Sequence, residues 1–299
     1  MFSNYIRGFC MGAADVVPGV SGGTIAFITG IYERLLQAIQ SFNIELLHLV
    51  RRREFRSIFL HTDLVFLIPL VLGIFSALLF FTRIIPLPAL IKSHPELVYG
   101  LFFGLILASI VVLSRTIRVF SGWNPLWLTL GAVTGLILVN LIPVQTPTNS
   151  WFIFLCGALA ISAMILPGIS GSFILLIMHK YIYIFSAIGR LDLTILIPFA
   201  LGICCGLMLF SRLLNWLLKR FHQQSLTTII GILIGSLWII WPFQQRDYVT
   251  INGREKLLGS TPIFPEQLDQ TVFYSLTLAL LGIVLVAMIH TLSKRRHSD

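Results

Sequence analysis

The chain has 299 residues, of which 57% are apolar and only 11% are charged, against about 25% charged residues in an ordinary soluble protein. This composition excludes a soluble enzyme, a disordered chain and a disulfide-stapled secreted module, and it is typical of an integral membrane protein. The net charge of +9 comes from basic residues at the ends of apolar runs, which indicates contact with anionic lipid heads and argues against nucleic acid binding.

Two long apolar runs, 8–40 and 152–189, are interrupted near their middle by Pro-Gly-Val-Ser-Gly-Gly-Thr at 18–24 and Pro-Gly-Ile-Ser-Gly-Ser at 167–172. Proline removes a backbone donor and glycine leaves helical geometry at low cost, so each helix should break there. Broken backbone at membrane depth needs protein or a watery cavity around it. In chain order we therefore predict a re-entrant hairpin at 8–40, membrane spans at 64–82, 98–114 and 126–143, a second re-entrant hairpin at 152–189, and spans at 193–218, 226–242 and 272–292.

The two interrupted runs are copies of each other. Shifting the sequence by 149 residues aligns 8–40 with 157–189 and gives 11 identities in 33 positions. The pattern continues downstream, where Pro69 and Gly73 match Pro198 and Gly202. We predict one all-α membrane domain, 1–299, made of repeats 1–147 and 148–299.

Each repeat would contain one hairpin that returns to its starting side and three spans. This odd number of crossings inverts the second repeat relative to the first. Fourteen of the 21 basic residues fall on the side of the two termini, so both termini are expected in the cytoplasm.

Inverted repeats with broken helices at equivalent places predict an alternating-access transporter site. The exposed N–H groups of a helix break favour an anion, and hydroxyl groups add further donors. We expect the two breaks to meet near the midplane of the membrane. The candidate anion-binding residues are Ser21, Gly22, Gly23, Thr24, Ser170, Gly171 and Ser172, and the candidate scaffold of the breaks is Pro18, Gly19, Pro167 and Gly168.

Other small residues in the chain have a simpler explanation. Glycine in membrane helices most often allows close helix packing. We favour that interpretation for Gly73, Gly202 and the Gly-x-x-x-Gly pairs at 100–104 and 231–235.

Charged residues inside apolar sequence are functional candidates. Asp15 precedes Pro18 by three residues, and it is a candidate for coupling or gating together with Glu33 and Arg34. Asp15 would either carry a proton or hold N–H groups of the loop. Arg83 and Arg212 occupy equivalent places at span ends, where interfacial anchoring and phosphate capture are both open. No histidine or carboxylate spacing indicates a metal, and no catalytic residue or cofactor is expected; coupling to H⁺ or Na⁺ stays open.

The run from Met11 to Glu33, together with Ile165–Ser172, resembles the PopT-type polyprenyl-phosphate translocases. The resemblance implies that the chain carries undecaprenyl phosphate from the outer to the inner leaflet of the bacterial cytoplasmic membrane. The carrier is reused there for peptidoglycan and other envelope polymers. Two alternatives remain: an ion-coupled transporter or channel for a small soluble anion, and a membrane enzyme such as a lipid-phosphate phosphatase. The oligomeric state, including a homo-oligomer, is open.

Overall fold

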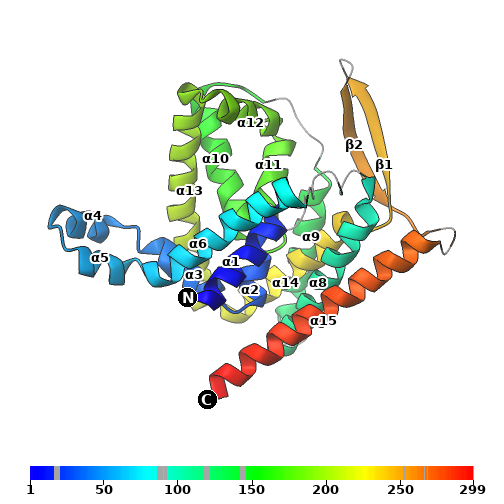
Figure 1. Ribbon diagram of the computed structural model, residues 1–299, viewed down its shortest axis with the longest axis horizontal. Coiled ribbons are helices and arrows are strands. Elements are labelled where there is room, and N and C mark those ends of the chain that lie inside the picture. Colours follow the sequence, from blue (N-terminus) through cyan, green and yellow to red (C-terminus); the bar gives the residue numbers. More distant parts are fainter. Residues whose placement is uncertain are drawn as a thin grey trace. The chain divides into compact units, whose positions relative to one another are not determined.

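The structure is a computed structural model that describes residues 1–16, 21–85, 90, 93–117, 122–141, 146–251, 254–265, 267 and 269–298. It is mainly helical, with one pair of strands (Figure 1). The elements are α1 (Phe2–Asp15), α2 (Gly22–Ile28), α3 (Tyr32–Gln40), α4 (Ile44–Arg51), α5 (Phe55–His61), α6 (Leu64–Leu79), the π-helix η1 (Phe80–Ile84), α8 (Pro95–Thr116), α9 (Asn124–Val139), α10 (Ser150–Ile165), α11 (Gly171–Ile177), α12 (Tyr181–Arg190), α13 (Leu193–Arg220), α14 (His222–Ile240), β1 (Gln244–Ile251), β2 (Arg254–Pro262) and α15 (Gln270–Ser298).

Each of the eight segments that the sequence assigns to the membrane contains at least one helix among its described residues. Among the described residues, four helices are long and apolar enough to cross a bilayer: α8, α13, α14 and α15. A fifth candidate joins α5 and α6, which are bent by 66° at the break between them. The apolar helices α9 and α10 are shorter, at 16 residues each. These helices are those of a multi-pass membrane protein.

Each interrupted run forms three helices. The first run contains α1, α2 and α3, and the second contains α10, α11 and α12. Pro18 and Gly19 of the first break lie outside the described residues, whereas Pro167 and Gly168 of the second are described and buried. Gly168 has φ +89°, a left-handed conformation that glycine adopts without steric cost. The sequence prediction of two helix breaks is therefore confirmed, and re-entrant insertion into a membrane stays a prediction.

The two runs also share the turn that follows the short helix after the break. Gly30 and His179, 149 residues apart, both have positive φ, +70° and +53°. The next residues, Ile31 and Lys180, each donate their N–H to the carbonyl five residues earlier, at 3.0 and 2.8 Å. This is the Schellman pattern that ends many helices. The duplication therefore extends from the sequence to the backbone hydrogen bonds of both runs.

The chain divides into two compact units that cut across the two repeats. The first unit contains Met1–Ile85 and Pro143–His222, and the second contains Pro86–Ile142 and Gln223–Asp299. Each unit therefore combines corresponding parts of both halves of the chain. Both interrupted runs, with the candidate site residues, belong to the first unit.

Glycine sets the helix packing in the first unit. Helix α1 packs along α6, and α10 packs along α13 (Figure 1). A Cβ added at Gly12 would lie 2.5 Å from the Ile74 carbonyl oxygen, and one at Gly206 would lie 2.5 Å from the Ala158 carbonyl oxygen. Gly73 and Gly202 each face the backbone of the partner helix in the same way. The helix-packing role predicted for these two glycines is confirmed.

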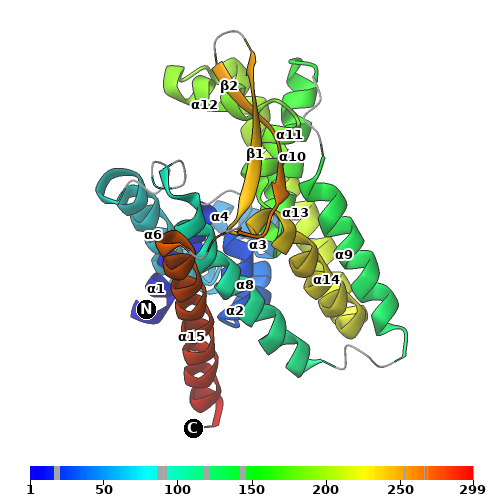
Figure 2. The ribbon, with the colours of Figure 1, turned by 90° about the vertical axis from the view of Figure 1, so that its right-hand side faces the viewer.

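Glycines also allow close helix packing in the second unit. Helix α8 packs along α15, and α9 lies beside α14 (Figure 2). Gly100 and Gly104 face the backbone of α15, whereas Gly231 and Gly235 face the backbone of α9. Each contact joins a helix from the first half of the chain to one from the second half. The predicted packing role of both Gly-x-x-x-Gly pairs is confirmed.

The two strands of the second unit were absent from the sequence prediction. β1 and β2 pair antiparallel, with Ile251 opposite Arg254. The sequence does carry a signal for them, because Asn252-Gly253 is the dipeptide most typical of a two-residue hairpin turn. That signal is easily passed over beside the much stronger hydropathy of the flanking helices.

Candidate functional site

The helix breaks of the two interrupted runs contact each other. The Ser21 hydroxyl donates to the Met164 carbonyl at 2.9 Å, and the Gly168 N–H donates to the Thr24 hydroxyl at 2.9 Å. Tyr32, which is only 2% exposed, donates its hydroxyl to the Ile165 carbonyl at 3.0 Å. The expectation that the two breaks meet is therefore confirmed, and their depth in a membrane stays a prediction.

The contact is close because glycine occupies it. A Cβ added at Gly23 would lie 2.6 Å from the Ile165 carbonyl oxygen and 3.0 Å from that of Met164. Real Cβ atoms do not approach backbone oxygen so closely, so a larger residue would push the two breaks apart.

Backbone donors of the first break are bound within the protein. The Gly22 N–H donates to the Asp15 carboxylate at 2.7 Å, and the Gly23 N–H donates to the Ser21 hydroxyl at 3.1 Å. The Thr24 N–H donates to the Ser21 carbonyl at 2.9 Å. Asp15 thus occupies the position at the start of α2 that an anionic ligand would take.

The second break is arranged differently. The Ser170 hydroxyl is hydrogen-bonded to the Ser172 hydroxyl at 2.8 Å, and unlike Ser21 it caps no backbone amide of the following helix. Within the described residues, the N–H groups of Gly171 and Ser172 have no hydrogen-bond acceptor. Two hydroxyls and two amides therefore gather at the start of α11 beside the first break.

Apart from Asp15, the charged candidates are not among the described residues that join the two breaks. Arg34 forms a two-pronged ion pair with Asp63, from Nε at 2.7 Å and Nη2 at 3.1 Å. Its guanidinium also lies 4.6 Å from the centre of the Phe66 ring. Glu33 and Arg212 are exposed, and the side chain of Arg83 lies outside the described part of the structure. Arg34 is therefore already paired, which favours a structural role for it.

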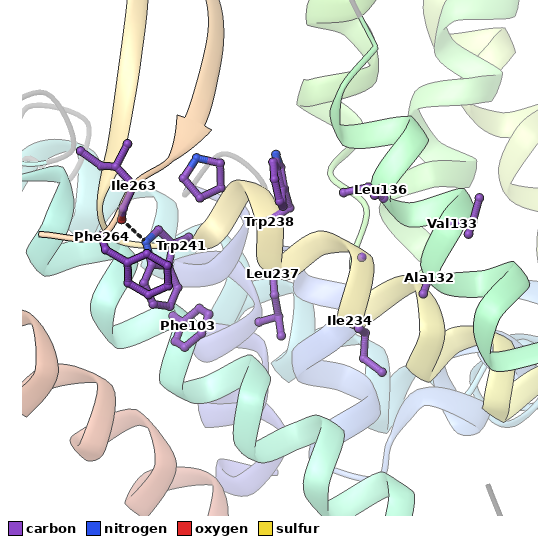
Figure 3. Close-up of a pocket in the computed structure, with 12 residues that line it drawn as sticks. Phe103, Ala132, Val133, Leu136, Ile234, Leu237, Trp238, Trp241, Ile263 and Phe264 are labelled. Carbon is purple, nitrogen blue, oxygen red and sulfur yellow. Dashed lines mark hydrogen bonds between the residues drawn. The ribbon is translucent and has the colours of Figure 1, made fainter. Parts of the chain in front are cut away.

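An apolar pocket lies in the second unit (Figure 3). Its volume is about 690 Å³, and its lining is aliphatic and aromatic: Phe103, Ala132, Val133, Leu136, Ile234, Gly235, Leu237, Trp238, Trp241, Pro262, Ile263 and Phe264. Trp241 donates its indole N–H to the Ile263 carbonyl at 2.9 Å, the dashed line in Figure 3. This contact ties the segment after β2 to the end of α14 and helps to shape the pocket.

Three residues near the site were missed by the sequence analysis. Tyr32 joins the breaks, Asp63 neutralises Arg34, and Lys180 is buried in the second run. Lys180 carried a usable signal, because a lysine inside an apolar run is a functional candidate by default. The roles of Tyr32 and Asp63 depend on long-range contacts that a single sequence does not display.

Comparisons with known proteins agree with the resemblance noted above. The profile of the undecaprenyl phosphate translocase-like family matches residues 11–258. A polyprenyl-phosphate transporter of Vibrio cholerae serotype O1 is 40% identical over 276 residues, which cover 92% of this chain and 88% of that protein. A polyprenyl-phosphate transporter of Staphylococcus aureus is 29% identical over 257 residues, covering 80% of this chain and 86% of that protein. No solved structure matches this chain. The chain belongs to the undecaprenyl phosphate translocase-like family.

Proposed function

We propose that this protein moves a polyprenyl phosphate, with undecaprenyl phosphate as the expected substrate, from the outer to the inner leaflet of the bacterial cytoplasmic membrane. The observation that carries the proposal is the hydrogen-bonded contact between the two helix breaks. It gathers buried hydroxyl and amide groups in a chain that is 57% apolar. Family membership and the names of the two relatives support the same substrate class.

The hydroxyl and amide groups at the two breaks can replace part of the hydration that the phosphate loses in the membrane. An ionised phosphate moved unaided into hydrocarbon loses hydration worth of order tens of kcal/mol. Fixed donors at mid-depth can replace part of that hydration while the apolar tail stays in lipid. We assign the phosphate site to the Ser170–Ser172 side of the contact, because the amides there have no acceptor among the described residues.

Asp15 provides a means of coupling. Its carboxylate accepts the Gly22 N–H at the first break, and a negative charge beside the contact of the two breaks disfavours a phosphate bound at the second break. Protonation of Asp15 removes this negative charge and therefore favours phosphate binding at the second break. Proton uptake at Asp15 would then accompany phosphate binding, and alternating access would carry both across. Glu33 is a weaker candidate, because it is exposed.

The apolar pocket of the second unit is suited to an isoprenoid chain. Its lining carries no charged side chain, and an isoprenoid chain gains about 25 cal/mol for each Å² of apolar surface that it buries. We propose that this pocket, considered by itself, binds an isoprenoid segment of a lipid. Both termini are proposed to face the cytoplasm, as the basic residues indicate.

The direct test is leaflet exchange of a fluorescent polyprenyl phosphate in liposomes that contain the purified protein. The native chain should accelerate exchange, and the double variant Ser21→Ala, Ser170→Ala should lose most of the acceleration. Ser186→Ala, an exposed serine on α12, is the matched control and should leave exchange unchanged.

Three results would contradict parts of the proposal. Full activity in a folded double variant would refute the site. Competition by a water-soluble phosphate analogue as strong as that by the lipid would favour a transporter of soluble anions. Release of inorganic phosphate from the lipid by the purified protein would favour a phosphatase.

A further inference from the structure

Lys180 is a buried cation in the turn between α11 and α12. It is 3% exposed, and its ammonium donates to the carbonyl and the hydroxyl oxygen of Thr146, both at 2.8 Å. The Thr146 hydroxyl in turn donates to the Met178 carbonyl. The ammonium also lies 5.7 Å from the centre of the Phe152 ring and 6.0 Å from that of Tyr183. All of these partners are neutral.

No carboxylate of the same unit balances this charge. The first unit contains six acidic residues, all with described side chains: Asp15, Glu33, Glu45, Glu54, Asp63 and Asp192. None of them lies within 4.0 Å of the Lys180 ammonium. Buried lysines are rare unless they are paired, because burial removes the hydration of the charge.

The fold itself does not require a lysine here. The equivalent residue of the first run is Ile31, which follows the same kind of turn and is 4% exposed. An apolar side chain therefore fills this position in one copy of the duplicated structure. Packing alone therefore does not explain why the second run has a lysine at this position.

Its position relates it to the proposed phosphate site. Lys180 follows the C-terminal end of α11, and Ser170 caps the N-terminal end of the same helix. The helix has seven residues, so the two ends are separated by about 10 Å along the axis. A phosphate bound at the ammonium would therefore lie about 10 Å from the Ser170–Ser172 cluster.

We propose that Lys180 is the charged member of an anion site at the α11–α12 turn, and that this site takes the phosphate monoester of the polyprenyl phosphate before it reaches the helix breaks. The inference rests on the proposed function. A lysine binds phosphate as a point charge, and its neutral partners Thr146, Phe152 and Tyr183 hold it without cancelling the charge.

The test titrates the purified full-length chain with a fluorescent polyprenyl phosphate, and in parallel with phosphatidylglycerol and with inorganic phosphate. Lys180→Met keeps the length of the side chain and removes the charge. It should weaken binding of the polyprenyl phosphate about tenfold to a hundredfold. Lys180→Arg should retain part of the affinity. Lys219→Met, at an exposed lysine in the last turn of α13, should bind like the native chain.

Thermal unfolding without lipid separates binding from folding. Removal of an unbalanced buried charge should leave the unfolding midpoint of Lys180→Met unchanged or raised. A lowered midpoint together with native affinity would show a structural lysine and overturn the inference. If Lys180→Met weakens the binding of phosphatidylglycerol by the same factor as the binding of polyprenyl phosphate, the site recognises lipid head groups in general. That result would overturn the assignment to the phosphate monoester.

The two proposals fail in different ways. If the native chain exchanges polyprenyl phosphate between leaflets and Lys180→Met binds it equally well, only the Lys180 inference is refuted. If the native chain shows no exchange, while inorganic phosphate binds in a manner that depends on Lys180, the anion site stands and the lipid substrate is refuted.

Discussion

The sharpest prediction concerns Ser21 and Ser170, which are equivalent in sequence but differ in their contacts. Ser21 is fully buried, donates to the Met164 carbonyl at 2.9 Å and accepts the Gly23 N–H at 3.1 Å. Ser21→Ala removes both hydrogen bonds, each worth about 1 kcal/mol, so we expect a loss of about 2 kcal/mol of unfolding free energy. The Ser170 hydroxyl bonds only the Ser172 hydroxyl among the described residues, so Ser170→Ala should cost about 0.5–1 kcal/mol.

Binding should show the opposite order. If the Ser170 hydroxyl donates to the phosphate, its loss removes a hydrogen bond to a charged group, worth about 1.5–3 kcal/mol, and affinity should fall at least about tenfold. The measurements are equilibrium unfolding in detergent and titration with a polyprenyl phosphate, each on both single variants. If Ser21→Ala and Ser170→Ala lose the same unfolding free energy, the proposed difference between the hydrogen bonds of the two hydroxyls is refuted. Native affinity in Ser170→Ala would refute the site assignment.

Further predictions follow from other contacts at the two breaks. Asp15→Asn keeps an acceptor for the Gly22 N–H but removes the charge, so leaflet exchange should lose its dependence on an imposed pH gradient; a retained dependence would exclude Asp15 as the proton carrier. Gly23→Ala places a Cβ 2.6 Å from a backbone oxygen of the second break and should abolish exchange at a cost of about 1–3 kcal/mol in unfolding free energy. Gly30→Ala, at φ +70° with open space around it, is its control: it should cost about 1–2 kcal/mol with exchange retained, and loss of exchange in both variants would indicate general destabilisation. His179→Gly should relieve the positive φ at that residue and raise the unfolding free energy by about 0.5 kcal/mol, as measured by equilibrium unfolding; a lowered value would show that the histidine side chain has a stabilising contact.

The sequence was sufficient for features that depend on local chemistry. Pro167 and Gly168 end α10 where the break was expected, and the glycines of α6, α8, α13 and α14 mark close helix crossings. These features follow from the residue itself, because a proline disrupts a helix and a glycine admits a neighbouring backbone whatever the rest of the chain does. The contact between the two breaks was also predicted, since the duplication places equivalent breaks in both halves.

The partners of the polar groups could not be predicted in the same way. Asp15 was expected either to carry a proton or to hold N–H groups of the loop, and the structure gives it the Gly22 N–H. Arg34 is a candidate for gating, and its partner in the structure is Asp63, 29 residues further along the chain. Whether a buried donor already has an acceptor depends on residues that are distant in the sequence, and so does the charge balance around Lys180.

The division of the chain into units adds a physical constraint on how the protein could have arisen from a duplication. Each helix crossing in the second unit joins α8 to α15 or α9 to α14, so neither repeat contains both helices of such a pair. One repeat alone would leave the glycine faces of these helices without a partner, and membrane helices associate mainly through such close packing. A single ancestral repeat would therefore have needed a second copy to complete these crossings.

Once both copies were joined in one chain, equivalent positions were free to diverge. Asp15 now faces a helix start in one copy while Met164 replaces it in the other, and Ile31 packs in one copy where Lys180 carries a charge in the other. The first copy thereby neutralises its own donors, and the second keeps donors and a cation for an anionic ligand. The two copies are therefore unequal at the positions where the proposed function places the phosphate.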